Sequence, residues 1–286
     1  MSAAPTEPRR AQPLDGRAVS DAVAARLAAR VAELPYVPRL VFVRVGEDPA
    51  SVFYVRSKQR YAKRVGVDAE TLVLRVDVDQ ATLMATIERL NADPATDAVL
   101  VQLPLPDHLD AAPVLEAIDP AKDVDGFHPM NVGRLWSGAP ALVPCTPLGL
   151  LAIVDHYELD VKGRHVVIIG RSHMVGKPAA ALFLGRHATV TVAHSRTRDL
   201  AGVVRQGEVV VAAVGRAGLV TGSMVQPGAI VLDVGMTRVD DRIVGDVADD
   251  VWDVAGYLTP MPGGTGLVTV AMVLQNTLTA AERRRG

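Results

Sequence analysis

The sequence predicts an α/β protein made of two units, each with a parallel sheet covered by helices on both faces. Nearly continuous apolar segments rich in β-branched residues alternate with segments of helical spacing, which is typical of buried parallel strands joined by helices. The alternation occurs twice and is interrupted by a proline-rich stretch at 104–129. A chain of 286 residues, 49% of them hydrophobic, is long enough for two modest domains. We place the boundary near Pro144.

The first unit begins with an amphipathic helix at 16–34, because Val19, Val23, Leu27 and Val31 recur every four residues. The elements predicted after it are strands at 39–45, 71–76 and 98–103, helices at 50–65 and 80–91, and one short helix at 114–118.

The second unit repeats this pattern and ends in a helix at 266–284 whose basic end suits the helix dipole. Before it we expect helices at 146–157 and 174–186 and strands at 165–170, 189–193, 208–214 and 229–234. The segment 1–13 is polar, carries three prolines and has no apolar core of a secretory signal. It predicts a disordered lead-in.

Composition excludes several classes of protein. A single cysteine, Cys145, excludes an internal disulfide and suits a reducing compartment. Thirty basic and thirty-two acidic residues give no overall electrostatic case for nucleic-acid binding. No apolar run reaches the roughly 18 residues of a membrane span, and no His or Cys spacing indicates a metal site. We therefore expect a cytoplasmic enzyme.

The sharpest local feature is the strand at 165–170 running into the turn Gly170-Arg171-Ser172 and a helix near Gly176. Free backbone N–H groups at such a helix start favour a phosphate. Ser172 replaces the middle glycine of the usual dinucleotide motif, so an ordinary strand-to-helix turn stands as an equal alternative.

The strand that follows distinguishes between the two nicotinamide cofactors. NAD sites carry a carboxylate about 20 residues after the first glycine, to bind the ribose hydroxyls. Here the strand ends in His194-Ser195-Arg196-Thr197-Arg198, with no carboxylate. A serine and arginines can bind a 2′-phosphate, which favours NADP, and a solvated basic loop is the alternative.

A candidate catalytic set lies in the first unit. Tyr54 and Lys58 are four residues apart and share a helix face. Gln102 follows a buried strand, where an amide needs a partner and can bind a lysine amine. Asp123 and Asp125 lie in an Asp-x-Asp-Gly turn. The alternatives are a solvated lysine and simple turn chemistry; a calcium loop is excluded because the remaining ligands are missing.

Together these segments resemble the bifunctional methylenetetrahydrofolate dehydrogenase/methenyltetrahydrofolate cyclohydrolase family. Matching residues cover nearly the whole chain in order: 45–51 with Tyr54, Val55 and Lys58; 101–106; 122–129 with Asn131 and Gly133; 144–147 with Gly149; 170–172 with Val175, Gly176 and Pro178; His194, Ser195 and Thr197; 233–235; and Pro260 with 262–264.

The resemblance implies a folate-binding catalytic domain of residues 1–145 plus 266–286 and a Rossmann-type NADP-binding domain of residues 146–265. The C-terminal helix would return to the first domain, and the active site would lie in the cleft between the two. It also implies a homodimer in one-carbon metabolism, which supplies purine biosynthesis.

The implied reactions are NADP-dependent oxidation of 5,10-methylenetetrahydrofolate to the methenyl form and its hydrolysis to 10-formyltetrahydrofolate. Carried over, Lys58 looks like the acid/base residue, Gln102 its hydrogen-bond partner, Tyr54 a stacking surface for the folate and Asp125 the pterin ligand. The substrate would also contact Pro262, Gly263 and Gly264. NADP would be bound by Gly170, Arg171, Ser172, Gly176, Ser195, Arg196 and Gly215.

Two positions depart from the family pattern after the double glycine. Thr265 stands where the family has valine, and Leu267 where it has proline. We expect a changed balance between the two activities, because a proline at this point fixes the start of the helix.

The departures also permit a catalytically silent NADP-binding sensor or accessory paralogue on the same scaffold. The intact set of Tyr54, Lys58, Gln102 and Asp125 favours the enzyme. A dehydrogenase of a small acid is disfavoured, because no His/Asp pair for hydride abstraction is evident. We expect His128 and Cys145 to be structural.

Overall fold

The computed structural model describes residues 11–240 and 242–286. The chain divides into two compact units. Of the described residues, unit 1 contains 11–19 and Thr146–Val268, and unit 2 contains Ser20–Cys145 and Thr269–Gly286. Both are α/β units, as the sequence predicts, and the fold class is confirmed.

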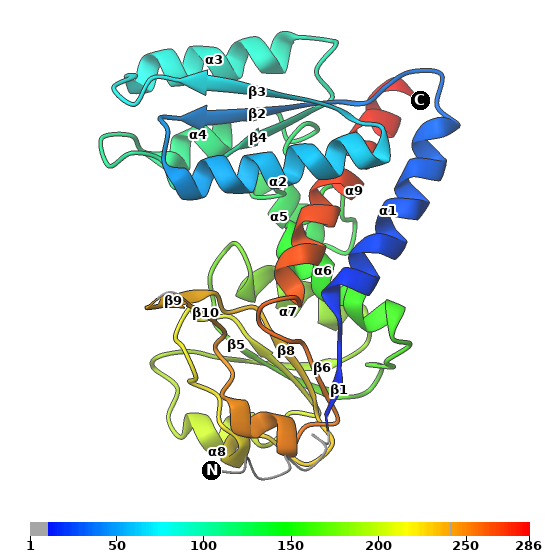
Figure 1. Cartoon of the computed structure of the whole chain (residues 1–286), viewed down its shortest axis with the longest axis vertical. Helices are drawn as coiled ribbons and strands as arrows, with labels where there is room; N and C mark the ends of the chain where they lie inside the picture. Colours follow the sequence, from blue (N-terminus) through cyan, green and yellow to red (C-terminus); the bar gives the residue numbers. More distant parts are fainter. Residues whose placement is uncertain (1–10, 241) are drawn as a thin grey trace, which may run out of the picture. The chain divides into compact units, whose positions relative to one another are not determined.

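Unit 2 is built on a three-stranded parallel sheet in the order β3-β2-β4 (Figure 1). The central strand is β2 (Arg39–Val45), flanked by β3 (Asp68–Leu74) and β4 (Ala98–Val101). The second strand begins three residues earlier than the predicted 71–76. The side chains of β3 mostly alternate between exposed and half-buried, as suits an edge strand. This pattern obscures the start of the strand in the sequence.

Helices cover both faces of this sheet. Val41 and Val43 of β2 pack in one apolar cluster with residues of α3 (Gln80–Ala92) and α4 (Ala111–Ala117). Phe42 points to the opposite face because strand side chains alternate. There it is fully buried beneath α2 (Pro49–Val65).

Helix α2 has clear start and stop signals. The Asp48 carboxylate accepts the Ser51 N–H at 2.8 Å as its N-cap, and Pro49 occupies the first turn. Gly66, at φ 85°, ends the helix in the left-handed conformation that glycine adopts without strain. The predicted helix at 50–65 is confirmed.

A helix that the sequence analysis missed, α5 (Pro129–Trp136), lies within the proline-rich stretch. His128 is its N-cap, since its Nδ1 accepts the Met130 N–H at 3.0 Å. His128 therefore has the structural role expected for it. Pro129 follows at the first turn, so this proline begins a helix and does not mark a loop.

Unit 1 contains a six-stranded parallel sheet in the order β1-β11-β8-β7-β5-β6 (Figure 1). Its strands are β1 (Gln12–Pro13), β5 (His165–Ile169), β6 (Thr189–Ala193), β7 (Val209–Ala212), β8 (Ile230–Asp233) and β11 (Tyr257–Leu258). After β5 the chain forms β6 on one side and β7 on the other. Ligands bind at this switch point in open α/β sheets.

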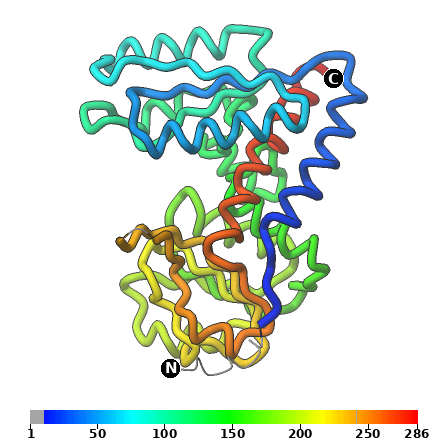
Figure 2. The backbone as a smooth tube through the Cα atoms, viewed as in Figure 1, coloured from blue at the N-terminus to red at the C-terminus, as the bar shows by residue number. Residues whose placement is uncertain are grey.

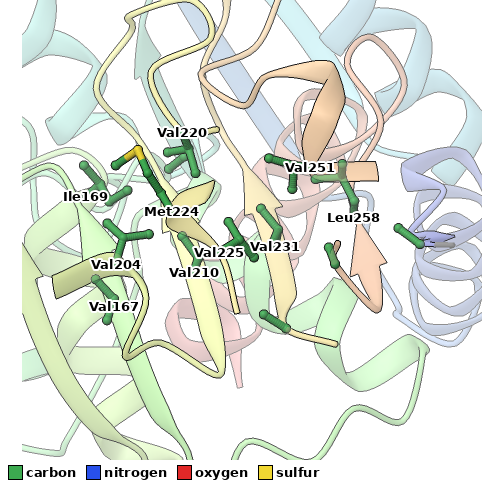
Figure 3. Packing of buried hydrophobic residues seen from close by; sticks show 14 of the residues in the cluster. Val167, Ile169, Val204, Val210, Val220, Met224, Val225, Val231, Val251 and Leu258 are labelled. Atoms are coloured by element: carbon green, nitrogen blue, oxygen red, sulfur yellow. The ribbon is translucent and has the colours of Figure 1, made fainter. Parts of the chain in front are cut away.

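One face of this sheet packs against α8 (Leu200–Val204) and the short 3-10 helices η1 (Gly222–Met224) and η2 (Asp249–Asp253). Figure 3 shows this cluster, in which Val167, Ile169, Val210, Val231, Val204, Val220, Met224, Val225, Val251 and Leu258 pack together. Helices α6 (Cys145–His156) and α7 (Gly176–Gly185) complete the unit. An unpredicted antiparallel hairpin joins β9 (Thr237–Val239) to β10 (Arg242–Val244).

The disordered lead-in predicted for residues 1–13 is wrong for its last three residues. Ala11 is buried and donates its N–H to Trp252 O at 3.0 Å, and β1 pairs with β11. An edge strand of two residues has no periodicity to read, which explains the error. Residues 1–10 lie outside the described part.

The C-terminal helix α9 (Thr265–Arg285) belongs to unit 2 from Thr269 onward, as predicted. Figure 2 traces it beside α1 (Gly16–Ala32), to which it is tied by the pair Arg30–Glu282 at 2.6 Å. At its end, Arg285 binds the fully buried Asp97 at 2.7 and 2.8 Å. Among the helices of the described part, none is both long and apolar enough to cross a membrane.

A buried lysine fixes the segment that follows α4. Lys122 is 1% exposed, and its Nζ donates to the carbonyl oxygens of Leu90, Asn91 and Asp93 at 2.7–2.8 Å. These carbonyls end α3, where helix geometry leaves them without partners and a cation is favourable. Lys122 O accepts the N–H of Val99 at 2.8 Å, so the segment lies against β4.

Replacing Lys122 by methionine should lower the free energy of unfolding by about 2 kcal/mol, because three carbonyl oxygens at the end of α3 lose a charged donor. Urea denaturation measures this, with Lys63→Met, an exposed lysine of the same unit, as the control. Equal midpoints for the two variants would contradict the role assigned to Lys122.

Candidate functional site

Lys58 and Gln102 meet at the carboxyl end of the unit 2 sheet. Lys58 Nζ donates to Gln102 Oε1 at 3.1 Å and lies 6.0 Å from the centre of the Phe42 ring. Gln102 directly follows β4, is 8% exposed, and donates its Nε2 to Leu103 O at 2.6 Å. That second bond settles which end of the amide faces the lysine. The predicted Lys58–Gln102 contact is confirmed.

The turn that carries Asp125 is fixed by the carboxylate of Asp123. Asp123, 1% exposed, accepts the N–H groups of Gly126 at 3.1 Å and His128 at 2.8 Å, and Asn131 Nδ2 at 3.1 Å. Gly126 is required, since it has φ 71° and a Cβ there would lie 2.5 Å from Val143 C. Asp123 therefore fixes the turn, and the carboxyl group of Asp125 is available to a ligand.

Helix α9 supports the same turn from a distant part of the sequence. Asn276 Nδ2 donates to Val124 O and Val143 O, each at 2.8 Å. The thiol of Cys145 also donates to Val124 O, at 3.1 Å. Cys145 is 4% exposed, and burial raises its pKa well above the usual value, so it is a packed residue and not a nucleophile.

The carboxyl group of Asp125 is electrostatically coupled to Lys58. Desolvation raises its pKa to about 6, while the positive charge of Lys58 lowers it and the negative charge of Asp123 raises it. Tyr54 lies one helical turn before Lys58, partly buried, with its ring edge-on to Phe53 at 5.9 Å. The structure thus gathers Lys58, Gln102 and Asp125 at one end of the unit 2 sheet, with Tyr54 on the same helix as Lys58.

In unit 1, two glycines allow close approach at the switch point. A Cβ on Gly170, the residue after β5, would lie 2.2 Å from Ala213 O, just after β7. A Cβ on Gly176, the first residue of α7, would lie 2.1 Å from Gly170 O. Ser172 Oγ accepts the N–H groups of Val175 at 3.1 Å and Gly176 at 3.4 Å. This compact strand–turn–helix fits a dinucleotide diphosphate.

The residues expected at a 2′-phosphate lie at the carboxyl ends of neighbouring strands. Arg171 follows β5, and Ser195 and Arg196 follow β6; all three are exposed. The turn after β6 is closed by His194, whose Nδ1 accepts the Arg196 N–H at 3.1 Å. A basic, hydroxyl-bearing edge without a carboxylate fits NADP.

The loop after β7, which carries Gly215, is bound by a buried carboxylate. Asp246 is fully buried and accepts the N–H groups of Val214 at 2.6 Å, Gly215 at 3.1 Å and Arg216 at 2.6 Å. No role was predicted for Asp246 from the sequence. Its only signal was a charged residue in an otherwise apolar run after β10.

The segment Pro262-Gly263-Gly264 packs against the start of α1. Gly16 donates its N–H to Gly263 O at 2.9 Å, and a Cβ on Gly16 would lie 2.0 Å from Gly264 O. The departure Thr265 is buried, and its hydroxyl donates to Asp233 O at 2.8 Å. A valine could not form that bond, so this chain ties the start of α9 to β8 through its own hydrogen bond.

Within residues 11–240 and 242–286, no cluster of His, Cys, Asp and Glu side chains could hold a metal ion.

Two family models match the chain. The tetrahydrofolate dehydrogenase/cyclohydrolase catalytic domain matches residues 14–125, and the NAD(P)-binding domain of the same family matches residues 144–285. The bifunctional protein FolD of Thermus thermophilus is 52% identical over 275 residues, which cover 96% of this chain and 98% of the relative.

Solved structures agree with these matches. A bifunctional FolD enzyme from Campylobacter jejuni has a TM-score of 0.93 at 41% identity, covering 96% of this chain and 99% of that one. The Trypanosoma brucei enzyme, complexed with NADP cofactor and an inhibitor, has a TM-score of 0.90 at 40% identity, with coverages of 96% and 98%. These matches support the active enzyme and not the silent paralogue. The chain belongs to the bifunctional tetrahydrofolate dehydrogenase/cyclohydrolase family.

Proposed function

We propose that this chain oxidises 5,10-methylenetetrahydrofolate with NADP and hydrolyses the product to 10-formyltetrahydrofolate, using Lys58, Gln102, Asp125 and Tyr54 on the folate side. The observation that carries the assignment is the hydrogen bond from Lys58 to Gln102, beside the charge-coupled Asp125. A lysine held by an amide next to a carboxylate can move protons on a bound substrate.

Hydrolysis is the step that needs proton transfer. Water adds to the methenyl carbon and loses one proton; a second proton then moves from the new hydroxyl to N5 as the C–N5 bond breaks. Lys58 takes up and returns these protons. Gln102 accepts one of its N–H groups and holds the amine in place. Asp125 binds the N–H donors of the pterin, and Tyr54 stacks on the folate.

The oxidation places different demands on the protein. NADP, when bound, accepts a hydride directly from the methylene carbon, so no side chain need carry it. The residues we assign to the cofactor are Gly170, Arg171, Ser172, Gly176, Ser195, Arg196 and Gly215. Pro262, Gly263 and Gly264 are assigned to the substrate. The two activities should therefore respond differently to loss of Lys58.

Lys58→Met should reduce hydrolysis by about 10²-fold or more, because it removes the acid/base group. Hydride transfer should fall far less. With 5,10-methylenetetrahydrofolate and NADP, the variant should accumulate the methenyl product together with NADPH, whereas the wild type should form NADPH without that accumulation. The control is Lys63→Met on the same helix. Equal loss of both activities in Lys58→Met would contradict the acid/base role and indicate a binding role.

The pKa of Asp125 predicts a pH dependence of folate binding. With a pKa of about 6, the carboxylate that receives the pterin N–H groups is lost as the pH falls through 6. Affinity for tetrahydrofolate should fall about tenfold between pH 7.5 and pH 5. Calorimetry under anaerobic conditions measures this. Asp125→Asn should bind weakly at both pH values with little dependence, and a slope as steep as that of the wild type would refute the assignment.

Arg171→Ala and Ser195→Ala should each raise the Kd of NADP about tenfold, because each removes a partner of the 2′-phosphate. The Kd of NAD, which lacks that group, should change little. Fluorescence titration of both nucleotides gives the ratio. Arg205→Ala, an exposed arginine after α8, is the matched control. Parallel loss of NAD and NADP affinity would argue against 2′-phosphate recognition.

The family resemblance and the composition also imply an oligomeric state, domain boundaries and a compartment, which remain predictions. We propose a cytoplasmic homodimer that supplies formyl groups to purine biosynthesis. Its proposed domains, residues 1–145 plus 266–286 and 146–265, differ from the two compact units in that residues 11–19 and 266–268 pack with the second domain. Family membership supports the homodimer and the metabolic role, and the single buried cysteine suits a reducing compartment. Light scattering of the purified protein tests the dimer.

A further inference from the structure

The loop between β7 and η1 contains three consecutive N–H groups that converge on one side chain. Asp246 Oδ2 accepts from Val214 and Gly215, and Oδ1 accepts from Arg216. Successive N–H groups arranged in this way form an anion-binding concavity. Here the anion is a carboxylate of the protein itself, and it is fully buried.

A second aspartate holds the first one in place. Asp233, at the end of β8, accepts the N–H of Asp246 at 3.0 Å and of Val247 at 3.1 Å. Two glycines make room for the pair. A Cβ on Gly235 would lie 2.2 Å from Asp246 Cγ, and a Cβ on Gly245 would lie 1.8 Å from Asp233 Oδ2. The position of the Asp246 side chain and that of its backbone are thus both fixed.

The loop so fixed borders the switch point of the sheet. It begins at Ala213, whose carbonyl oxygen faces Gly170 at the end of β5, and Ala213 donates its N–H to Ile169 O at 2.8 Å. Because Asp246 occupies its N–H groups, the loop cannot use them on a nucleotide phosphate. The diphosphate is left to the turn between Gly170 and Gly176.

We propose that Asp246 is a positioning residue for NADP: its carboxylate shapes the loop at 213–216 into one wall of the nucleotide site and closes it to phosphate. This rests on the proposed assignment of Gly215 to the cofactor. Asp246 acts through the loop and touches no substrate atom itself.

Asp246→Asn is the direct test, because the amide keeps the shape of the side chain but turns an NH₂ toward at least one N–H donor. The Kd of NADP should rise about tenfold or more, since a buried donor loses its partner. Amide exchange of the peptide covering 213–218 should accelerate. Hydrolysis of 5,10-methenyltetrahydrofolate needs no nucleotide and should change much less. Asp160→Asn, which alters an exposed turn carboxylate of the same unit, is the matched control.

Each outcome decides the matter. Unchanged exchange and unchanged NADP affinity would overturn the proposal, as would a general loss of protection in which hydrolysis and NADP affinity fall together. Faster loop exchange with unchanged NADP affinity would remove Gly215 and its loop from the nucleotide site, while the Arg171 and Ser195 variants test the rest of that site independently.

A measurement on the wild type covers the case in which Asp246→Asn does not fold. The peptide at 213–218 should be protected from exchange without nucleotide, because Asp246 already binds its N–H groups, and NADP should add little. Protection that arises only with NADP would overturn the proposal.

Discussion

Buried aspartates that accept several backbone N–H groups hold loops in both units of this protein. Asp123 does so in unit 2, and Asp233 and Asp246 do so in unit 1. Loops at strand ends have no ladder to satisfy their backbone groups, yet they must present ligand-binding residues at fixed positions. A carboxylate can accept several donors at once, so one side chain can fix a whole turn.

Burying these carboxylates has a cost that their N–H partners offset. The pKa of Asp233 is raised to about 6, mainly by desolvation and to a smaller extent by the negative charge of Asp246, while three backbone N–H groups oppose the rise. Loss of those donors would leave a charge in an apolar interior, which is strongly unfavourable. Glycines beside the two carboxylates are therefore as necessary as the aspartates, since any Cβ at Gly235 or Gly245 would displace them.

Local patterns in the sequence predicted strands β2, β3 and β4 of unit 2 and β5, β6, β7 and β8 of unit 1, because buried parallel strands and the helices between them have strong periodicity. The contact of Lys58 with Gln102 was also predictable, since an amide at the end of a buried strand needs a partner. Contacts between residues that lie far apart in the sequence were not predictable. Asn276 reaches Val124 across 152 positions of the chain, and Asp246 reaches Gly215 across 31. Neither pairing has a local signal. Strands β1 and β11 were missed because two residues are too few to show a periodicity, and α5 was missed because it begins with a proline.

Asp125 and Asp233 show why a shifted pKa alone does not identify a ligand-binding group. Both carboxyl groups have a pKa near 6, with desolvation as the main cause. Asp233 is already bound by N–H groups of Gly235, Asp246 and Val247. Asp125 has no hydrogen-bond partner within the described residues, and its stabilising neighbour is the charge of Lys58. A carboxylate that is desolvated but not hydrogen-bonded gains most from the N–H donors of an incoming ligand, which supports Asp125, and not Asp233, as the proposed pterin ligand.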